Sequence, residues 1–194
     1  MTRTKVYLIL QAALCVLLVA LLSASAVSIY REGAARKAEH PLEPIYTREI
    51  APEGREVGQR LPDFALPCYD GSEFHLADQR GKVTFINLWA TSCTPCKHEL
   101  PYFDALYRAH EGDIAMLVVH SSMVLDDPAE YLADRGYAMP FATDDDDDTV
   151  AEIVGSTGTF PQTIVLNRRG EVVYNEVGSV TPQMLSALYE QANQ

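Results

Sequence analysis

Two cysteines three positions apart stand between a strand pattern and a helix pattern, and this arrangement constrains the fold most. Residues 83–89 are almost all apolar, which predicts a buried strand. Apolar side chains in residues 97–110 recur at helical spacing. Cys93 and Cys96 therefore lie at a strand-to-helix turn, where their thiols can close into a small disulfide loop. The free N–H groups and positive dipole end of a helix start favour Cys93 as a thiolate.

Other uses of this cysteine pair fit the sequence less well. Structural zinc needs about four ligands. Cys15 and Cys68 are isolated, and His98 is expected to face water. No metal site is therefore expected. A single-cysteine peroxidase site is disfavoured, because no proline-led motif precedes Cys93 and a second thiol stands beside it. A CxxC pair next to a strand–helix pattern indicates redox chemistry.

The chain divides into three parts. Residues 1–29 contain a long apolar run, 6–29, which is long enough to span a bilayer and predicts a membrane anchor. A cleaved signal peptide, processed near 24–26, is the alternative. Basic residues flank the run almost equally, so charge alone leaves its orientation open. Residues 30–58 are predicted to form a tether and residues 59–194 the folded domain.

Acidic residues dominate the charge of this protein. The net charge of −12 argues against a nucleic-acid partner, because no basic stripe is available to meet phosphate. The densest acidic run, residues 144–148, lacks the glycine and terminal glutamate of an EF-hand loop. We expect it to form a solvated loop, with Asp148 or Thr149 capping a short helix that runs to Val154.

The predicted elements alternate between strands and helices. A hairpin is expected from residues 63–66 and 73–76, and a last helix begins with Thr181 as its N-cap and Pro182 as its first residue. Further strands are predicted at 83–88, 114–119, 162–166 and 171–174, and further helices at 93–110 and 128–135. This order predicts an α/β fold with a mixed central sheet flanked by helices.

The segment 89–97, Trp-Ala-Thr-Ser-Cys-Thr-Pro-Cys-Lys, resembles the active-site segment of thioredoxin-fold proteins. The Leu-Pro-Asp-Phe stretch at 61–64 and the apolar amino terminus narrow the resemblance to membrane-tethered extracytoplasmic thioredoxins of the TlpA, ResA and CcmG type. It covers about residues 61–191, and Pro101 and the segment 158–161 are among its most specific pieces. The resemblance implies a thioredoxin fold with an N-terminal β-hairpin, preceded by one transmembrane helix.

The resemblance also implies roles for individual residues. Cys93 matches the exposed nucleophile, and Cys96 matches the buried resolving thiol. Pro161 matches a proline whose preceding peptide bond is cis, a conformation largely confined to X–Pro bonds. The backbone of Thr159 and Phe160 would then be free to pair with an extended substrate.

Glu99 matches an acidic residue that related proteins place near the cysteines. A carboxyl group there could shift a thiol pKa and relay a proton to the departing sulfur. Asn87 stands where ordinary cytoplasmic thioredoxins carry a buried aspartate, so Glu99 is the expected acid. The alternative for Glu99 is an exposed helical charge.

Three further positions leave their roles open. Ser92 stands where many relatives have a second tryptophan. A serine at this position removes apolar cover from the dithiol. Trp89 remains, either as core packing or as a residue that shapes the site. Cys68 is expected to be an inert apolar residue, with a regulatory mixed disulfide as the alternative.

The implied activity is that of an extracytoplasmic thiol–disulfide oxidoreductase, held at the cell membrane by a single span. It would reduce disulfides in partner proteins, such as apocytochrome c or surface enzymes, and be recharged by a membrane thiol carrier of the CcdA or DsbD type. Beyond the redox-active Cys93–Cys96 pair, no cofactor is implied. The alternatives are a thiol oxidase, a docking module that does not turn over, and a thiol-dependent copper handler.

Overall fold

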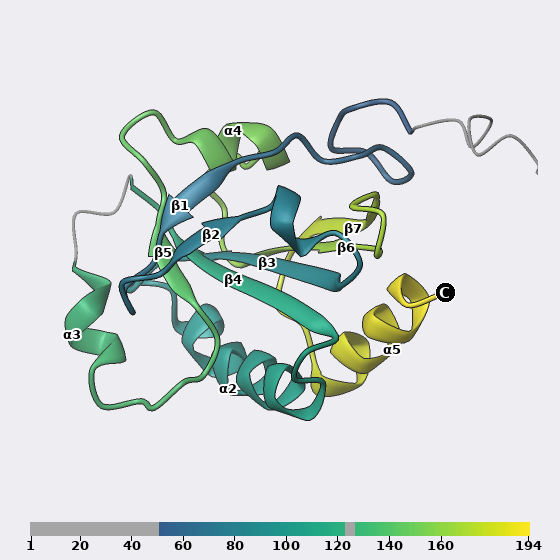
Figure 1. The fold of residues 1–194 in the computed structure, drawn as a ribbon. Helices are drawn as coiled ribbons and strands as arrows, with labels where there is room; N and C mark the ends of the chain where they lie inside the picture. Colours follow the sequence, from purple (N-terminus) through teal and green to yellow (C-terminus); the bar gives the residue numbers. More distant parts are fainter. Residues whose placement is uncertain (1–50, 123–126) are drawn as a thin grey trace, which may run out of the picture. The chain divides into compact units, whose positions relative to one another are not determined.

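The computed structural model describes residues 51–122 and 127–194. A five-stranded sheet with the order β5-β4-β3-β6-β7 runs through this part of the chain (Figure 1). Strands β4 and β5 run parallel to β3, whereas β6 and β7 are antiparallel to their neighbours, which confirms the predicted mixed sheet. The strands are β3 (Val83–Trp89), β4 (Ile114–His120), β5 (Phe141–Thr143), β6 (Gln162–Leu166) and β7 (Val172–Val177).

The central strands are apolar because both faces of the sheet are covered. Every residue of β3 and β4 is buried, as expected for parallel strands between two layers. Side chains alternate between the faces. Phe85 and Trp89 belong to the core cluster that includes residues of α2 and α5, whereas Ile86 and Leu88 belong to the cluster on the opposite face.

Helices and a hairpin form the two covering layers. Helices α2 (Thr94–Ala109) and α5 (Pro182–Ala192) cover one face, while α4 (Thr149–Val154) and the hairpin of β1 (Ala65–Pro67) and β2 (Glu73–His75) lie on the other (Figure 1). A 3₁₀ turn, η2 (Ala77–Gln79), follows the hairpin. The predicted hairpin is confirmed, as is the N-cap of α5, where Thr181 accepts the Met184 N–H at 3.2 Å.

Each edge strand of the sheet is hydrogen bonded to a segment outside it. On the β5 side, Cys68 forms an antiparallel bridge with Ala142, and the Tyr69 N–H donates to the Phe141 carbonyl at 2.9 Å. On the β7 side, both the Gly58 N–H to Val172 O and the Val172 N–H to Gln59 O bonds measure 2.8 Å. Ordered structure on this side therefore includes residues that the sequence assigns to the tether.

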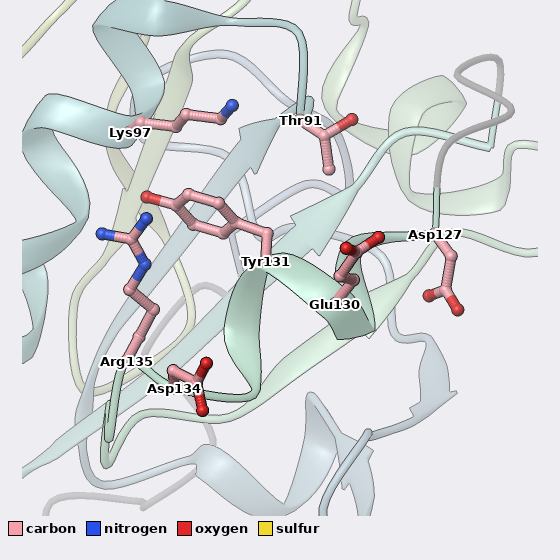
Figure 2. Close-up of a pocket in the computed structure, with 7 residues that line it drawn as sticks. All are labelled: Thr91, Lys97, Asp127, Glu130, Tyr131, Asp134 and Arg135. Atoms are coloured by element: carbon pink, nitrogen blue, oxygen red, sulfur yellow. The ribbon is translucent and has the colours of Figure 1, made fainter.

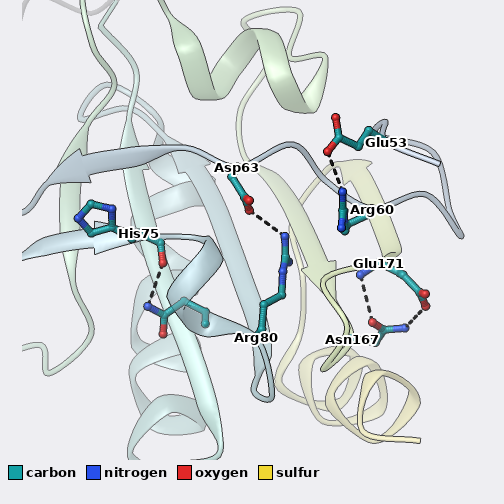
Figure 3. Close-up of polar contacts among 8 residues, drawn as sticks. Glu53, Arg60, Asp63, His75, Arg80, Asn167 and Glu171 are labelled. Carbon is teal, nitrogen blue, oxygen red and sulfur yellow. Dashed lines mark hydrogen bonds and ion pairs between the residues drawn. The ribbon is translucent and has the colours of Figure 1, made fainter. Parts of the chain in front are cut away.

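Ion pairs fix the chain leading into the hairpin (Figure 3). Arg60 pairs with Glu53 at 2.8 Å, and Arg80 pairs with Asp63 at the same distance. Across the β6–β7 turn, Asn167 donates to the Glu171 carboxylate at 2.8 Å. Such exposed pairs contribute roughly 0–1 kcal/mol each, so their effect is to orient the segment more than to stabilise it.

The acidic loop differs from its prediction. Asp144 is 5% exposed, and its carboxylate accepts the N–H groups of Val150 at 3.0 Å and Ala151 at 2.8 Å. Asp148 precedes the helix with φ 54° and forms no side-chain cap. Asp148 therefore stands at the N-cap position of a helix that ends at Val154, as predicted, but the expected side-chain cap is wrong. The carboxylates of Asp144 and Asp145, further back in the chain, reach the free N–H groups instead.

Two elements also depart from the expected boundaries. Strand β5 was not predicted, and helix α3 (Pro128–Leu132) ends before the predicted limit at residue 135. The predicted membrane span, residues 6–29, lies outside the described residues. Within the described ranges, no helix has both the length and the apolar character needed to cross a bilayer.

Candidate active site

The two cysteines lie where the end of β3 turns into α2. Cys93 is the N-cap residue of α2 in an extended conformation, and it is disulfide-bonded to Cys96 with their Cα atoms 5.3 Å apart. The Cys93 sulfur accepts the Cys96 N–H at 3.2 Å. Proline is tolerated at Pro95 because the first helical N–H groups have no partner within the helix. The local sequence thus places one sulfur directly on the helix start.

The two sulfurs differ in their access to solvent. Cys93 is partly buried, whereas Cys96 has an exposed fraction of 0% and belongs to the core cluster beneath the helix. An attacking thiol from another protein can therefore approach Cys93 but not Cys96. The burial of Cys96 is as expected, and the roles of nucleophile and resolving thiol stay predictions.

Glu99 lies three residues after Cys96, on the same side of α2. It is 1% exposed, so the alternative of an exposed helical charge is wrong. Its Oε1 accepts the Asn87 amide at 2.9 Å, and its Oε2 accepts the Val180 N–H at 3.0 Å. Burial raises the pKa of Glu99 to about 7, against the lowering effect of these hydrogen bonds. The carboxyl can therefore gain or lose a proton near neutral pH.

Asn87 connects Glu99 to the sheet. It is fully buried on β3 opposite Thr163 of β6, and its Nδ2 donates to Thr163 Oγ1 at 3.2 Å as well as to Glu99. Sequence reasoning treated Asn87 only as a replacement for aspartate and did not foresee Thr163 or the Val180 N–H. A main-chain donor leaves no signal in the sequence, because every residue except proline carries one.

The predicted cis bond is present between Phe160 and Pro161. Gln162 pairs with Leu88, so Pro161 lies at the end of β3 that leads to the dithiol. Pro161 is buried, Phe160 is partly buried and Thr159 is exposed. Sequence-distant segments 93–96 and 159–161 are therefore brought to the same end of the sheet.

Trp89 is a core residue next to this site. It has an exposed fraction of 0%, and its ring lies 5.3 Å from that of His120, 5.5 Å from Tyr131 and 6.2 Å from Phe141, measured between centroids. The packing therefore supports the core role among the two alternatives. The side chain of Ser92, by contrast, is exposed and does not shield the dithiol.

A surface pocket of about 690 Å³ lies beside the dithiol segment (Figure 2). Lys97 Nζ lies 5.0 Å and the Arg135 guanidinium 4.3 Å from the centroid of the Tyr131 ring, distances that suit cation–π contacts. The pocket was not predicted, because helical periodicity does not tell which residues of α2 and α3 meet. Its lining residues are Thr91, Lys97, Asp127, Glu130, Tyr131, Asp134 and Arg135.

Cys68 lies apart from the pair, in the bridge to β5. It is buried and carries a free thiol, and burial raises the pKa of that thiol. Within residues 51–122 and 127–194, no group of three or more His, Cys, Asp or Glu side chains is arranged to hold a metal ion.

Residues 56–191 match the Redoxin family. The chain belongs to this family. The redoxin is 33% identical over 132 residues to the thiol-disulfide oxidoreductase ResA of Geobacillus kaustophilus, covering 66% of this chain and 72% of that protein. It is 28% identical over 136 residues to the thioredoxin-like protein YneN of Bacillus subtilis, covering 66% of this chain and 75% of YneN.

Comparison with a solved structure supports the same fold. The crystal structure of a thiol:disulfide interchange protein DsbE from Chlorobium tepidum, described there as putative, matches with a TM-score of 0.61 and 25% identity, covering 71% of this chain and 97% of that one. The expected thioredoxin-like fold is confirmed. With its Cys93–Cys96 pair, this redoxin is a thiol–disulfide oxidoreductase that reduces protein disulfides.

Proposed function

We propose that this redoxin reduces disulfides of partner proteins outside the cytoplasm while its N-terminal segment holds it at the cell membrane. The observation that carries the chemistry is the unequal pair at the start of α2, with Cys93 partly buried and Cys96 fully buried. The apolar run 6–29 supports the membrane attachment. Disulfide exchange with proteins also fits a compartment in which disulfides persist.

In the proposed cycle, the Cys93 thiolate attacks one sulfur of a client disulfide. The client S–S bond breaks, one client sulfur leaves with the electron pair, and a mixed disulfide forms with Cys93. Cys96 then loses its proton and attacks the Cys93 sulfur, which releases the second client sulfur. Two electrons pass to the client, and the Cys93–Cys96 disulfide remains.

Glu99 is the proposed acceptor of the Cys96 proton. It lies one helical turn from Cys96, and a pKa near 7 suits a group that both takes and returns a proton at neutral pH. When the pair is reduced again, Glu99 would return the proton to the Cys96 sulfur. The two thiols supply all the electrons, so the cycle needs no organic cofactor or metal.

The client is proposed to bind as an extended segment next to the cis peptide bond. Thr159 is exposed and lies just outside β6, at the sheet end that leads to the dithiol. Backbone groups at such a position can pair with an added strand. Clients would be proteins with accessible disulfides, including apocytochrome c, and a thiol carrier of the CcdA or DsbD type would recharge the pair.

Trapping tests this proposal. In a Cys96→Ser variant of the full chain expressed in its own cell, the mixed disulfide on Cys93 cannot be resolved and should accumulate. Non-reducing gels and mass spectrometry would then identify the trapped proteins and the compartment from which they come. A Cys93→Ser variant is the matched control and should trap far less, because Cys96 is buried. Equal trapping by the two variants, or trapping of cytoplasmic proteins alone, would contradict the proposal.

A further inference from the structure

The side-chain amide of Asn87 uses its nitrogen fully in hydrogen bonds but leaves its oxygen unpaired. Both hydrogens of its Nδ2 are used, one toward Glu99 Oε1 at 2.9 Å and one toward Thr163 Oγ1 at 3.2 Å. Its Oδ1 is buried and, among the described residues, has no hydrogen-bond partner. Buried polar atoms are paired in the great majority of cases. The orphaned Oδ1 beside a carboxyl group therefore needs an explanation.

This orientation of the amide suits an ionised Glu99. An ionised carboxylate only accepts hydrogen bonds, and here each oxygen meets a donor: the Asn87 amide at Oε1 and the Val180 N–H at Oε2. When Glu99 is protonated, the Val180 N–H at Oε2 favours the carbonyl oxygen at that position, because a carbonyl oxygen is a better acceptor than an acid hydroxyl. The acid proton is then favoured on Oε1, where it would face the hydrogens of Asn87 Nδ2.

A half-turn of the amide removes this conflict. Oδ1 then takes the place of Nδ2 and can accept two hydrogen bonds, one from the protonated Oε1 of Glu99 and one from the Thr163 hydroxyl. A hydroxyl both donates and accepts, so Thr163 fits either orientation. Two hydrogen bonds to the amide form in each state, and the unpaired amide atom changes from Oδ1 to Nδ2 with its two hydrogens.

We infer that Asn87 is a positioning residue whose amide reverses when Glu99 gains or loses its proton, holding the carboxyl in one place in both states. This inference deepens the proposed function, on which it rests for the role of Glu99 as the proton acceptor. Glu99 can then receive the Cys96 proton without moving away from the sulfur. A buried aspartate at position 87 could serve both states only by taking up a proton itself, because an ionised carboxylate offers acceptors only.

Few other titratable groups face Glu99. The dithiol lies on its own helix, and Tyr174 of β7 is near enough to respond to the Glu99 charge, although burial is the main cause of its raised pKa. Strands β3 and β6 contribute the neutral Asn87 and Thr163. In the described residues, no salt bridge involves Glu99. In the oxidised protein Cys93 and Cys96 are joined in the disulfide and carry no thiol protons, so neither of them titrates alongside Glu99.

Nuclear magnetic resonance on the oxidised full chain in mild detergent tests the inference. The two Nδ2 proton signals of Asn87 should shift with pH at the same midpoint as the Glu99 carboxyl carbon, near pH 7. In Glu99→Gln the new amide can accept the Val180 N–H and donate to Asn87, as the protonated acid does. The Asn87 signals should then stay at their acid positions throughout. The inference fails if they stay constant while Glu99 titrates, or if their shift persists in Glu99→Gln.

A pair of variants supplies a second readout. Asn87→Leu removes the donor that favours the ionised form and should raise the Glu99 midpoint by about one pH unit, since hydrogen bonds to charged groups are the stronger ones. Thr163→Val is the matched control, because it removes one hydrogen bond from both states and should move the midpoint much less. Equal shifts in the two variants would overturn the inference, and the wild-type titration decides the question even if Asn87→Leu does not fold.

The two proposals fail in different ways. If Glu99→Gln reduces disulfides as fast as wild type, the proton relay is wrong, whatever the Asn87 signals show. If Glu99→Gln is slow but the wild-type Asn87 signals ignore the Glu99 titration, the relay stands and the amide reversal is wrong.

Discussion

The Cys93 sulfur accepts a hydrogen bond from the main-chain N–H of Cys96 at 3.2 Å. The donor is one of the first N–H groups of α2, which have no partner within the helix. Once the disulfide is reduced, this N–H and the helix dipole favour the thiolate of Cys93 over its thiol. The thiolate of the neighbouring Cys96 is not stabilised in this way, because Cys96 lies in the core.

The three cysteines of the described domain should differ sharply in reactivity. In reduced protein at pH 7, we expect iodoacetamide to modify Cys93 at least about tenfold faster than Cys96 or Cys68, because thiolate character and access both favour Cys93. Burial also raises the pKa of the Cys68 thiol. Mass spectrometry of timed samples measures the three rates. Faster labelling of Cys96 than of Cys93 would contradict the assigned roles.

Glu99 should make the stability of the oxidised protein depend on pH. Its pKa is raised from 4.5 to about 7, so the folded state binds this proton more tightly than the unfolded chain. The stabilisation is therefore complete below about pH 4.5 and is lost as the pH rises through about 7. Between pH 5 and pH 8 this amounts to about 2 kcal/mol of unfolding free energy.

Urea unfolding at the two pH values measures this effect. Glu99→Gln carries no titrating group at this position, so its unfolding free energy should fall by about 2 kcal/mol less than that of wild type between pH 5 and pH 8. A parallel decline in the two proteins would mean that Glu99 ionises with an ordinary pKa.

Asp144 should stabilise the domain through α4. Its carboxylate accepts N–H groups of Val150, Ala151 and Asp145. Asp144→Ala leaves these donors without their acceptor and should lower the unfolding free energy by about 1–3 kcal/mol. Asp146→Ala, at an exposed position of the same loop, is the matched control and should change it by less than about 0.5 kcal/mol. Denaturant unfolding of both variants distinguishes a cap from a general effect of removing negative charge.

Cys68 should be dispensable for disulfide exchange. It is buried in the bridge to β5, away from the Cys93–Cys96 pair. We expect Cys68→Ala to reduce a disulfide-bonded test peptide within about twofold of the wild-type rate, since it removes only a small apolar side chain. A mixed disulfide found on Cys68 in protein isolated from cells would instead support a regulatory role.

Much of the fold was predictable because its signals are local. The apolar run that forms β3, the helical spacing after Cys96 and the Thr181-Pro182 start of α5 each depend on neighbours in the chain. The dithiol was predictable for the same reason, since its spacing and its place between a strand and a helix are visible in the sequence. The cis bond before Pro161 followed from family resemblance, and no local pattern requires it.

The unpredicted parts depend on residues that meet only in the folded chain. Asp144 caps the helix in place of Asp148 because the loop turns the Asp144 carboxylate inward, and a run of five identical aspartates does not show which of them turns inward. Strand β5 has three residues, too few for a periodic signal. The contact between Glu99 and Val180 joins positions 81 residues apart and uses a main-chain donor. Sequence pattern carries no information about such a partner.

The two bonded segments at the edges of the sheet have a consequence for self-association. An open edge strand offers a row of unpaired N–H and C=O groups that another chain can extend. Here the bridge from Cys68 occupies part of β5, and Gly58 and Gln59 occupy part of β7. Two molecules of this protein therefore have fewer unpaired N–H and C=O groups on β5 and β7 through which their sheets could pair. Gly58, Gln59 and Cys68, which come early in the folded domain, thus also protect it against aggregation.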